Sequence, residues 1–549
     1  MRFKSCARAI QILAATLVLT AVFPHAIGAQ RAVDNSNDGT PRLIRQEKTV
    51  QFMVDGQPML IIGGELHNSS ASSLDYMDSI WQRMVDLHFN TVITPLSWEL
   101  IEPVEGHFEF SLVDGLILGA RRHGLRLIFL WFGSWKNGMS SYLPMWVKRD
   151  YTRFPRVKIG DGETIEVLST LAESNRNADA RAFAALMRHV REFDGRDHTV
   201  LMMQIENEVG ILGDSRDRSE AANRAFSGPV PKSLIDSLAT HRRELTPEVL
   251  ERWQSGGFKT QGSWEEVFGP GAATEELFMA WHYAEYIDHV AAVGKKEYDI
   301  PMYVNAWLGG PPANPGDYPS GGPLPHVMDV WLAGAPHVDL LAPDIYASNF
   351  AEWCQRYVQR GNPLFIPEMH GDAGGARNVF YAFGEHSALG TSPFAVDSIH
   401  DPAQSPLSES YDVLQQIAPL ILEHRGTGEM VGFLLDEDHP SVKRQLGGYE
   451  LEISLDSIFN YRAQFGSGLI VAVAPDEFVG AGSGFRVAFK PLTPGPALAG
   501  IGYVEEGTYR DGKWIPGRRL NGDENDQGRK WRAVGRKPSI TRCQIYRFE

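Results

Sequence analysis

The feature that most constrains the fold is the alternation of short apolar runs with segments of helical period between Gln51 and about Arg425. The runs are too continuous for a sheet with one wet face, so they indicate strands buried on both faces of a parallel sheet. Eight such runs in series predict an α/β fold, a (β/α)₈ TIM barrel. The predicted strands are residues 59–64, 91–95, 125–132, 199–205, 302–305, 339–345, 364–367 and 391–396.

Two helix-start signals fall between the fourth and fifth predicted strands. Thr246 precedes Pro247 at a first helical position, and Ser263 with Glu266 makes a capping box. Both lie in residues 211–271, a stretch much longer than an ordinary loop after a strand. We therefore expect a helical insertion at the C-terminal face of the barrel, which either shapes the substrate cleft or forms a subdomain away from it.

The helical period disappears after about Arg425. Strand-like runs separated by Gly, Pro and Asp/Asn-rich turns replace it, and they predict a smaller C-terminal β-sandwich domain. We place the catalytic barrel at residues 49–428 and the β-sandwich at 429–549. The predicted strands of the second domain are residues 430–435, 451–453, 469–474, 485–489 and 545–548.

The first 29 residues have the pattern of a secretory signal peptide. Basic residues near the start precede an apolar stretch, and small residues at 26–29 suit cleavage. The apolar stretch, residues 9–23, is shorter than the ~20 residues that span a bilayer, and no other segment is long and apolar enough. We expect cleavage, a polar linker at residues 30–48, and a secreted or periplasmic protein with no membrane span.

Composition excludes several classes of function. The formal charge of −16 and the lack of a basic run argue against a nucleic-acid partner. Beyond the leader only Cys354 and Cys543 remain, so neither a disulfide framework nor a Cys-based zinc site is expected. The histidines form no ligand pair, and the acidic cluster at 436–439 has the character of a solvated turn; we expect no metal and no cofactor. The sequence carries no signal for an oligomeric state.

Two glutamates each follow an apolar run and are separated by 160 residues. Glu208 comes after the fourth predicted strand and Glu368 after the seventh. In a (β/α)₈ barrel the carboxyl ends of the strands converge on one mouth, so the two side chains are expected to face each other. A proton donor and an ionised nucleophile are what retaining glycoside hydrolysis requires. We predict Glu208 as the acid/base and Glu368 as the nucleophile; Glu206 is the alternative acid, less favoured because it lies further from the mouth.

Other residues at the ends of predicted strands are candidates for binding a sugar. Asn207 is placed to donate to the 2-hydroxyl, and Tyr346 to hydrogen-bond the nucleophile. Aromatic rings stack on the C–H faces of sugars, although some rings at strand ends serve packing alone. The further predicted substrate-binding residues are Trp98, Glu99, Trp135, Asn137 and Trp307.

At these residues the chain resembles glycoside hydrolase family 35, the β-galactosidases of a large retaining clan with (β/α)₈ barrels. Residues 204–210, Gln-Ile-Glu-Asn-Glu-Val-Gly, are similar to the acid/base motif Q-I-E-N-E-Y-G, and residues 367–369 to the nucleophile motif P-E-F. Residues 62–67, 98–108 and 143–146 resemble three further motifs in family order. The resemblance covers roughly residues 45–428.

The resemblance implies an exo-acting retaining enzyme that releases terminal β-galactose. The segments 509–514 and 519–524 resemble the β-domain of bacterial members that trim xyloglucan, which implies a plant oligosaccharide as substrate. Asn68 and Glu99 depart from the family pattern, so galactose recognition rests on less than the hydrolytic mechanism does. Two alternatives remain: a clan relative that cleaves another β-linkage, such as a β-glucoside, and a non-catalytic carbohydrate-binding barrel.

Overall fold

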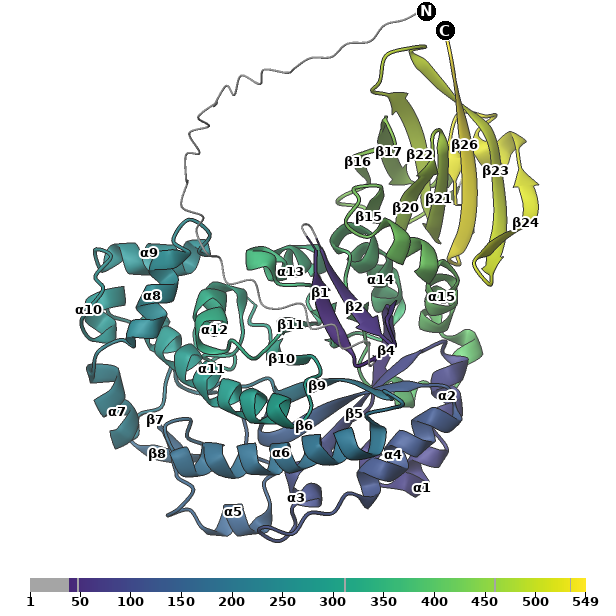
Figure 1. The fold of residues 1–549 in the computed structure, drawn as a ribbon. Coiled ribbons are helices and arrows are strands. Elements are labelled where there is room, and N and C mark those ends of the chain that lie inside the picture. The colour runs from purple at the N-terminus through teal and green to yellow at the C-terminus, as the bar shows by residue number, and fades with distance from the viewer. Residues whose placement is uncertain (1–38, 47–48, 311–312, 459–460, 534) are drawn as a thin grey trace, which may run out of the picture. The chain divides into compact units, whose positions relative to one another are not determined.

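The computed structural model describes residues 39–46, 49–310, 313–458, 461–533 and 535–549. Its largest sheet is parallel, in the order β12-β14-β4-β5-β6-β9-β10-β11-β13. The terminal strands β12 and β13 are halves of one strand interrupted at Pro367, so the sheet closes as an eight-stranded barrel and confirms the predicted fold (Figure 1). The strands are β4 (Ile61–Glu65), β5 (Thr91–Ser97), β6 (Arg126–Lys136), β9 (Val200–Asn207), β10 (Met302–Trp307), β11 (Leu340–Ile345), β12 (Phe365–Ile366), β13 (Glu368–Met369) and β14 (Gly390–Thr391).

Both faces of the barrel strands are buried, which explains their continuous apolar sequences. In β6, Ile128 and Leu130 belong to the cluster inside the barrel, whereas Leu127 and Phe129 pack outward against the helices. Successive side chains of a strand point to opposite faces, so burial on both sides removes the polar residues that a one-sided sheet would show.

Helices surround the barrel and bury one apolar stripe each. In α4, Val113, Leu116, Ile117 and Ala120 are buried, a spacing that places them on the face turned toward the strands. The helices α4, α6 and α11 can be followed in Figure 1. Because such helices bury one apolar stripe each, the sequence between the apolar runs has a helical period. The helices outside the insertion are α1 (Leu74–Asp78), α2 (Trp81–Asp86), α3 (Trp98–Ile101), α4 (Ser111–Arg122), α5 (Met145–Arg149), α6 (Glu173–Asp194), α11 (Ala272–Glu297), α12 (Met328–Gly334), α13 (Phe350–Tyr357), α14 (Ala373–His386) and α15 (Pro406–His424).

A small antiparallel sheet contributes to the core inside the barrel. It consists of β1 (Arg42–Arg45), β2 (Val50–Val54) and β3 (Gln57–Pro58). Phe52 of β2 is fully buried in the cluster that fills the barrel interior. The prediction of a linker at 30–48 is therefore wrong for β1, which pairs with β2 in a sheet that covers apolar barrel residues.

Residues 211–271 form the predicted helical insertion. Its helices are α7 (Glu220–Ser227), α8 (Lys232–Thr240), α9 (Pro247–Ser255) and α10 (Trp264–Phe268). The capping box of Ser263 and Glu266 is present at α10. Thr246 is the N-cap of α9 with Pro247 in the first turn, but its hydroxyl donates to Asp329 instead of capping the helix. A second excursion, the hairpin β7 (Arg156–Ile159) and β8 (Glu163–Leu168), follows β6 and α5.

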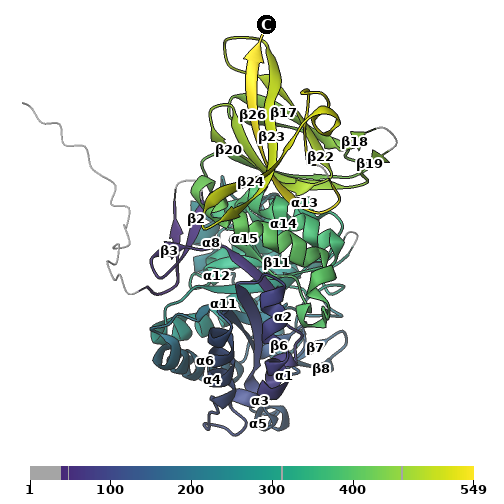
Figure 2. The ribbon, with the colours of Figure 1, turned by 90° about the vertical axis from the view of Figure 1, so that its right-hand side faces the viewer.

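Two antiparallel sheets form the C-terminal region, in the orders β15-β20-β21-β26-β23-β24 and β16-β17-β22-β25. The strands of this region are seen in Figure 2. The side chains of the two sheets share one core, which includes Phe433, Ile453 and Trp531, as a sandwich requires. The region packs against the barrel helices: Gly384 of α14 lies so close to Leu469 that an added Cβ would stand 2.6 Å from the leucine Cβ. The strands are β15 (Met430–Leu435), β16 (Ser441–Leu446), β17 (Tyr449–Leu455), β18 (Ser457–Ile458), β19 (Tyr461–Arg462), β20 (Gly466–Ala474), β21 (Glu477–Ser483), β22 (Phe485–Pro491), β23 (Leu498–Arg510), β24 (Lys513–Leu520), β25 (Trp531–Arg532) and β26 (Ser539–Phe548).

The predictions of a signal peptide and of no membrane span concern different parts of the chain. The predicted signal peptide, residues 1–29, lies outside the described residues. Within the described residues, no helix combines the length and the apolar character needed to cross a bilayer.

Candidate active site

Glu208 and Glu368 meet at the carboxyl ends of their strands, as predicted. Glu208 directly follows β9 and Glu368 begins β13, and both are nearly buried, at 6% and 5% exposed. Together with Asp344 at the end of β11, they each offer a carboxylate oxygen, and these three oxygens lie within 4.8 Å of one another. Two distant stretches of sequence thus supply one cluster of carboxyl groups.

Glu368 accepts hydrogen bonds from three neutral side chains. Asn207 donates to its Oε1 at 3.2 Å, Asn305 to the same oxygen at 3.4 Å, and the Tyr346 hydroxyl to Oε2 at 2.9 Å. Hydrogen bonds to a carboxylate stabilise its ionised form. The donors therefore suit an attacking anion, and they include Tyr346, which the sequence analysis placed beside the nucleophile.

Glu208 has the opposite environment. Burial and the nearby charge of Glu368 raise the pKa of Glu208 to about 8, against an opposing effect of Lys136. Its backbone N–H donates to the Asn305 side chain at 2.9 Å, which fixes the start of the loop. A carboxyl group with this pKa keeps its proton at neutral pH, as a general acid must.

Glu206, the alternative acid, lies away from this cluster. Its carboxylate accepts from the backbone N–H groups of Ser134 at 3.0 Å and Trp135 at 2.6 Å. Burial, followed by the charge of Asp179 on α6, raises its pKa. Glu206 is fully buried on the helix side of the strand, so its role here is to hold the end of β6.

The backbone at Glu208 breaks the alternation of the strand. In a regular strand Glu206 and Glu208 would point to the same face and Asn207 to the other. Glu208 instead has a φ of +46°, in the left-handed region, and both Asn207 and Glu208 lie beside Glu368. Such a backbone conformation costs on the order of 1 kcal/mol or more and is typical of functional sites.

The remaining predicted binding residues divide into two groups. Trp307 ends β10 with 40% of its surface exposed, and Asn137 donates its backbone N–H to the carbonyl of Asn207. Glu99 is partly exposed and pairs with Lys148 at 3.7 Å. All three keep part of their surface exposed.

Trp98 and Trp135 do not line the mouth, and their prediction as substrate-binding residues is wrong. Trp98 is fully buried, donates to Glu102 at 2.8 Å and packs edge-on against Trp146. Trp135 is 1% exposed and packs against tyrosines of α11. Trp98 directly follows β5 and Trp135 is the second-last residue of β6, but both rings turn into the core, where their N–H groups find acceptors.

Sequence reasoning missed three polar residues of the site. Asn305 bridges Glu208, Asp344 and Glu368. Asp344 is 2% exposed, and burial together with Glu368 raises its pKa. Glu65 at the end of β4 is fully buried, neither of its carboxyl oxygens has a partner among the described residues, and burial raises its pKa. Each is a polar residue at or near the last position of a barrel strand, and that position was the signal that could have found them.

Among the described residues, Glu208, Asp344 and Glu368 are the group of three potential ligands close enough to share a metal ion. The same three groups provide the raised pKa and the stabilised carboxylate described above. The chemistry open to this arrangement without an ion is proton transfer from Glu208 combined with attack by Glu368.

Residues 70–287 match the family described as Beta-galactosidase, glycoside hydrolase family 42. This segment resembles glycoside hydrolase family 42 and is called the family-42-type segment below. The resemblance to family 35 is not confirmed by this match, and family 42 is the better supported of the two. The family-42-type segment contains Glu208 but ends before Glu368. Residues 407–532 match a family described as Domain of unknown function (DUF5597).

One named relative is similar to the chain over a limited length. A beta-galactosidase of Arthrobacter sp is 25% identical over 211 residues, which cover 36% of this chain and 28% of the relative. The chain thus spans little more than a quarter of that protein.

Two crystal structures of beta-galactosidases are similar to this one. That from Bacillus circulans sp. alkalophilus has a TM-score of 0.46 at 16% identity, covering 66% of this chain and 57% of its own. That from the psychrophilic Marinomonas ef1 has a TM-score of 0.45 at 14% identity, covering 67% and 60%.

Proposed function

We propose that the protein is a retaining, exo-acting β-galactosidase that releases terminal β-linked galactose from oligosaccharides. The observation that carries the proposal is the pair of nearby carboxyl groups in unlike environments: Glu208 with a pKa of about 8, and Glu368 hydrogen-bonded by three donors. Their oxygens lie within 4.8 Å, which suits the separation of roughly 5 to 5.5 Å between the carboxyl groups of retaining enzymes and falls short of the roughly 6.5 to 9.5 Å of inverting enzymes.

In the first step Glu368 attacks the anomeric carbon of the galactoside. The bond from that carbon to the leaving oxygen breaks as Glu208 transfers its proton to this oxygen. The products are a galactosyl ester of Glu368, the freed alcohol and the Glu208 carboxylate. Asn207 donates to Glu368 and stands beside the 2-hydroxyl, where a hydrogen bond strengthens as the charge of the sugar ring grows.

In the second step the Glu208 carboxylate takes a proton from water, and the water oxygen attacks the anomeric carbon. The ester bond breaks, Glu368 leaves as a carboxylate, and Glu208 is protonated again. Two inversions at one carbon give galactose with its β configuration retained. The hydroxyl of Tyr346 stabilises the departing carboxylate.

The family-42-type segment and the named relative support galactose as the released sugar. The discriminating experiment compares aryl β-galactoside with aryl β-glucoside, using Glu208→Gln and Glu368→Gln as controls. We expect faster hydrolysis of the galactoside and loss of activity in both variants. A faster glucoside reaction would assign the alternative β-glycosidase, and no hydrolysis by the wild type would favour a carbohydrate-binding protein.

Azide distinguishes the two roles. With Glu368→Gly, azide replaces the nucleophile and gives an α-galactosyl azide; with Glu208→Ala, azide attacks the glycosyl ester and gives the β anomer. Proton NMR of the products identifies each anomer. The same anomer from both variants would contradict the separate roles.

The substrate in nature is proposed as a galactosylated plant oligosaccharide such as a xyloglucan fragment, encountered after export directed by residues 1–29. The support is the sequence resemblance of residues 509–524 and the pattern of the leader. Mass analysis of the protein from cell fractions tests export: a chain that keeps these residues in the cytoplasm would contradict it.

A further inference from the structure

A cavity of about 640 Å³ is lined by none of the three clustered carboxyl groups and has no role in the mechanism above. Its walls come from α9 of the insertion, the first turns of α11, the segment around Tyr318 after β10, and α13 after β11. The insertion follows the carboxyl end of β9, the segment around Tyr318 follows that of β10, and α13 follows that of β11. The helix α11 begins at the same end of the barrel and leads back to the start of β10. The cavity therefore opens on the same end of the barrel as Glu208.

The wall that carries Tyr318 is joined to the loop of the catalytic acid. The backbone groups of Ser320 and Ile211 exchange two hydrogen bonds, at 2.9 and 3.0 Å, and Ile211 lies three residues beyond Glu208. Gly210, which lies between Glu208 and Ile211, has a φ of +142°, and a Cβ added there would stand 2.4 Å from the carbonyl carbon of Pro319. The exit of β9 and the cavity wall thus form one continuous surface.

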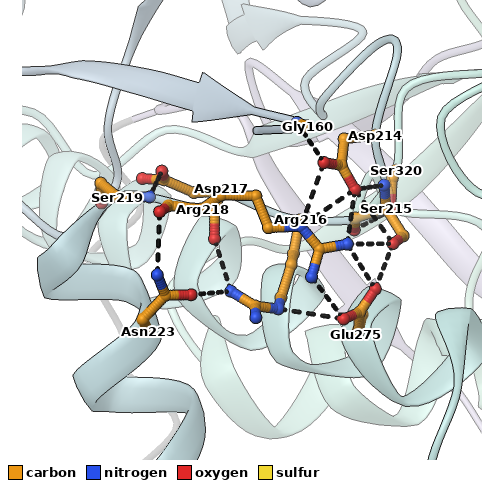
Figure 3. A network of polar contacts seen from close by, with 10 residues as sticks. All are labelled: Gly160, Asp214, Ser215, Arg216, Asp217, Arg218, Ser219, Asn223, Glu275 and Ser320. Carbon is orange, nitrogen blue, oxygen red and sulfur yellow. Dashed lines mark hydrogen bonds and ion pairs between the residues drawn. The ribbon is translucent and has the colours of Figure 1, made fainter. Parts of the chain in front are cut away.

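Polar and charged residues connect the segment that carries Ser320, the base of the insertion and α11 (Figure 3). The Ser320 hydroxyl donates to the carbonyl of Ser215 at 2.7 Å. Arg216 and Arg218 both reach Glu275 on α11, at 3.1 and 2.6 Å. The base of the insertion is therefore held against the helix that forms a second wall of the cavity.

The lining of the cavity includes a buried carboxyl group, that of Glu276. Glu276 is only 2% exposed; its Oε2 accepts from the Tyr318 hydroxyl at 3.1 Å and lies 2.9 Å from Nε2 of His326. Its Oε1 is buried and has no partner among the described residues. A buried carboxylate oxygen without a donor is costly, and Glu276 lines the cavity, so a shift of its side chain toward that space would let a ligand hydroxyl donate to this oxygen.

The lining favours a neutral ligand with many hydroxyl groups. Four glutamates line the cavity against two arginines, and one of the arginines, Arg356, is paired with Glu248 at 2.8 Å. An anion would meet an excess of negative charge, whereas hydroxyl groups can both donate to the carboxylates and accept from the guanidinium groups. The volume lies within the range of sites for small ligands, ~300–1,000 Å³.

We propose that this cavity binds the leaving-group sugars of an oligosaccharide, the part that departs after protonation by Glu208. The inference rests on the proposed function, which puts galactose at the carboxyl cluster and the rest of the substrate beyond it. Trp307, exposed at the end of β10, lies on the segment between the cluster and Tyr318. The insertion is thereby assigned a role in selecting long substrates.

Two neighbouring alanines of α11 allow a matched test. Ala273 lines the cavity, whereas Ala272 is exposed outside it. The rates to measure are kcat/KM for 4-nitrophenyl β-galactoside, lactose and a galactosylated xyloglucan oligosaccharide. We expect Ala273→Trp to lower the oligosaccharide-to-aryl ratio of kcat/KM about tenfold or more, because the indole fills the subsite. Ala272→Trp should leave this ratio at the wild-type value.

A binding measurement covers the case in which the tryptophan disturbs folding. In the Glu208→Gln background, calorimetry with the same oligosaccharide should show about tenfold weaker binding when Glu276 is changed to Gln, which keeps the size and removes the charge. Wild-type ratios in Ala273→Trp, or unchanged binding in the Glu276→Gln double variant, would overturn the cavity assignment. A wild type that hydrolyses no β-galactoside at all would instead overturn the proposed function, and this inference with it.

Discussion

Both the catalytic cluster and the base of the insertion contain buried or partly buried carboxyl groups, but the pKa of Glu208 in the first is raised and the pKa of Asp214 in the second is lowered. Around Glu208, Asp344 and Glu368 the carboxyl groups lie close to one another and Lys136 is the nearby cation, so burial raises the pKa of Glu208 to about 8. Around Arg218, burial alone would also raise the pKa of Asp214, but hydrogen bonds from Arg218 and two backbone N–H groups hold it at about 2.

The difference shows that burial alone does not decide what a carboxyl group does. Paired with guanidinium groups, Asp214 and Glu275 stay ionised and join the insertion to the barrel. Grouped with other carboxyls, Glu208 keeps a proton that it can give away. The five predictions that follow alter one region or the other.

The largest effect is expected at the nucleophile. Glu368→Gln removes the attacking anion and should lower kcat by on the order of 10⁴-fold or more, since no covalent intermediate can form. Steady-state rates on aryl β-galactoside measure this. Glu192→Gln, an exposed carboxylate on α6, is the matched control. A loss of less than tenfold at Glu368 would show that another group attacks.

Glu208→Gln should lower kcat by about 10²- to 10⁴-fold on natural glycosides, because the leaving oxygen then departs without a proton. The loss should shrink for 2,4-dinitrophenyl galactoside, whose leaving group needs no proton. Rates on the two substrates, measured in parallel, check the prediction. An equal loss on both would argue against an acid role.

The insertion network should matter for stability. Arg218→Met leaves Asp214 and Glu275 partly buried without this cation and should cost about 2 kcal/mol of the free energy of unfolding. Arg224→Met removes an exposed i,i+4 pair with Glu220 and should cost less than about 0.5 kcal/mol. Urea unfolding compares them, and equal costs would refute a structural role for the network.

The contribution of Asp214 to the free energy of unfolding depends on pH in a direction that its lowered pKa defines. The folded-state pKa of Asp214 is depressed from 3.8 to about 2. Its contribution to stability is therefore complete above pH ~4 and is lost as pH falls from there toward 2. Arg218→Met should lack most of this acid-dependent loss, and unfolding curves between pH 2 and 5 would reveal whether it does.

The smallest expected effect is a shift in a pH profile. The acid form of Glu208 is lost as pH rises through about 8, so kcat/KM should fall on the alkaline side near that pH. Lys136 lowers the pKa of Glu208, so Lys136→Met should move this limb to higher pH. A limb that stays in place, or that moves to lower pH, would mean that another group controls it.

The fold was largely predictable because burial on both faces leaves an unmistakable apolar run. All eight predicted barrel strands overlap observed ones, although β14 is limited to Gly390–Thr391. In the sandwich, β16 was missed: Lys443 and Arg444 occur among its six residues, and its exposed side chains interrupt the apolar pattern. The exposed outer strand β24 was missed for the same reason. Strands wet on one face or at an edge carry weaker signals than buried ones.

The candidate site was predictable where function follows position along a strand, and not where it depends on side-chain direction. Glu208 and Glu368 were found from their places after two strands. Trp98 occupies an equally promising place, yet its ring turns into the core. The separation of Glu206 from Glu208 depends on the left-handed backbone of both residues, which no periodicity reveals. Asn305 was missed because its bridging contacts join three strands.

The split of the seventh strand at Pro367 has a consequence for how the chain matures. The half that bears Glu368 pairs with β11, the other half pairs with β14, and β14 in turn pairs with β4 near the opposite end of the sequence. Contacts between such distant segments form late, because a long stretch of chain must be ordered first. During synthesis on the ribosome, the three donors to Glu368 emerge before it, whereas the barrel can close only after β14 has emerged and joined β4.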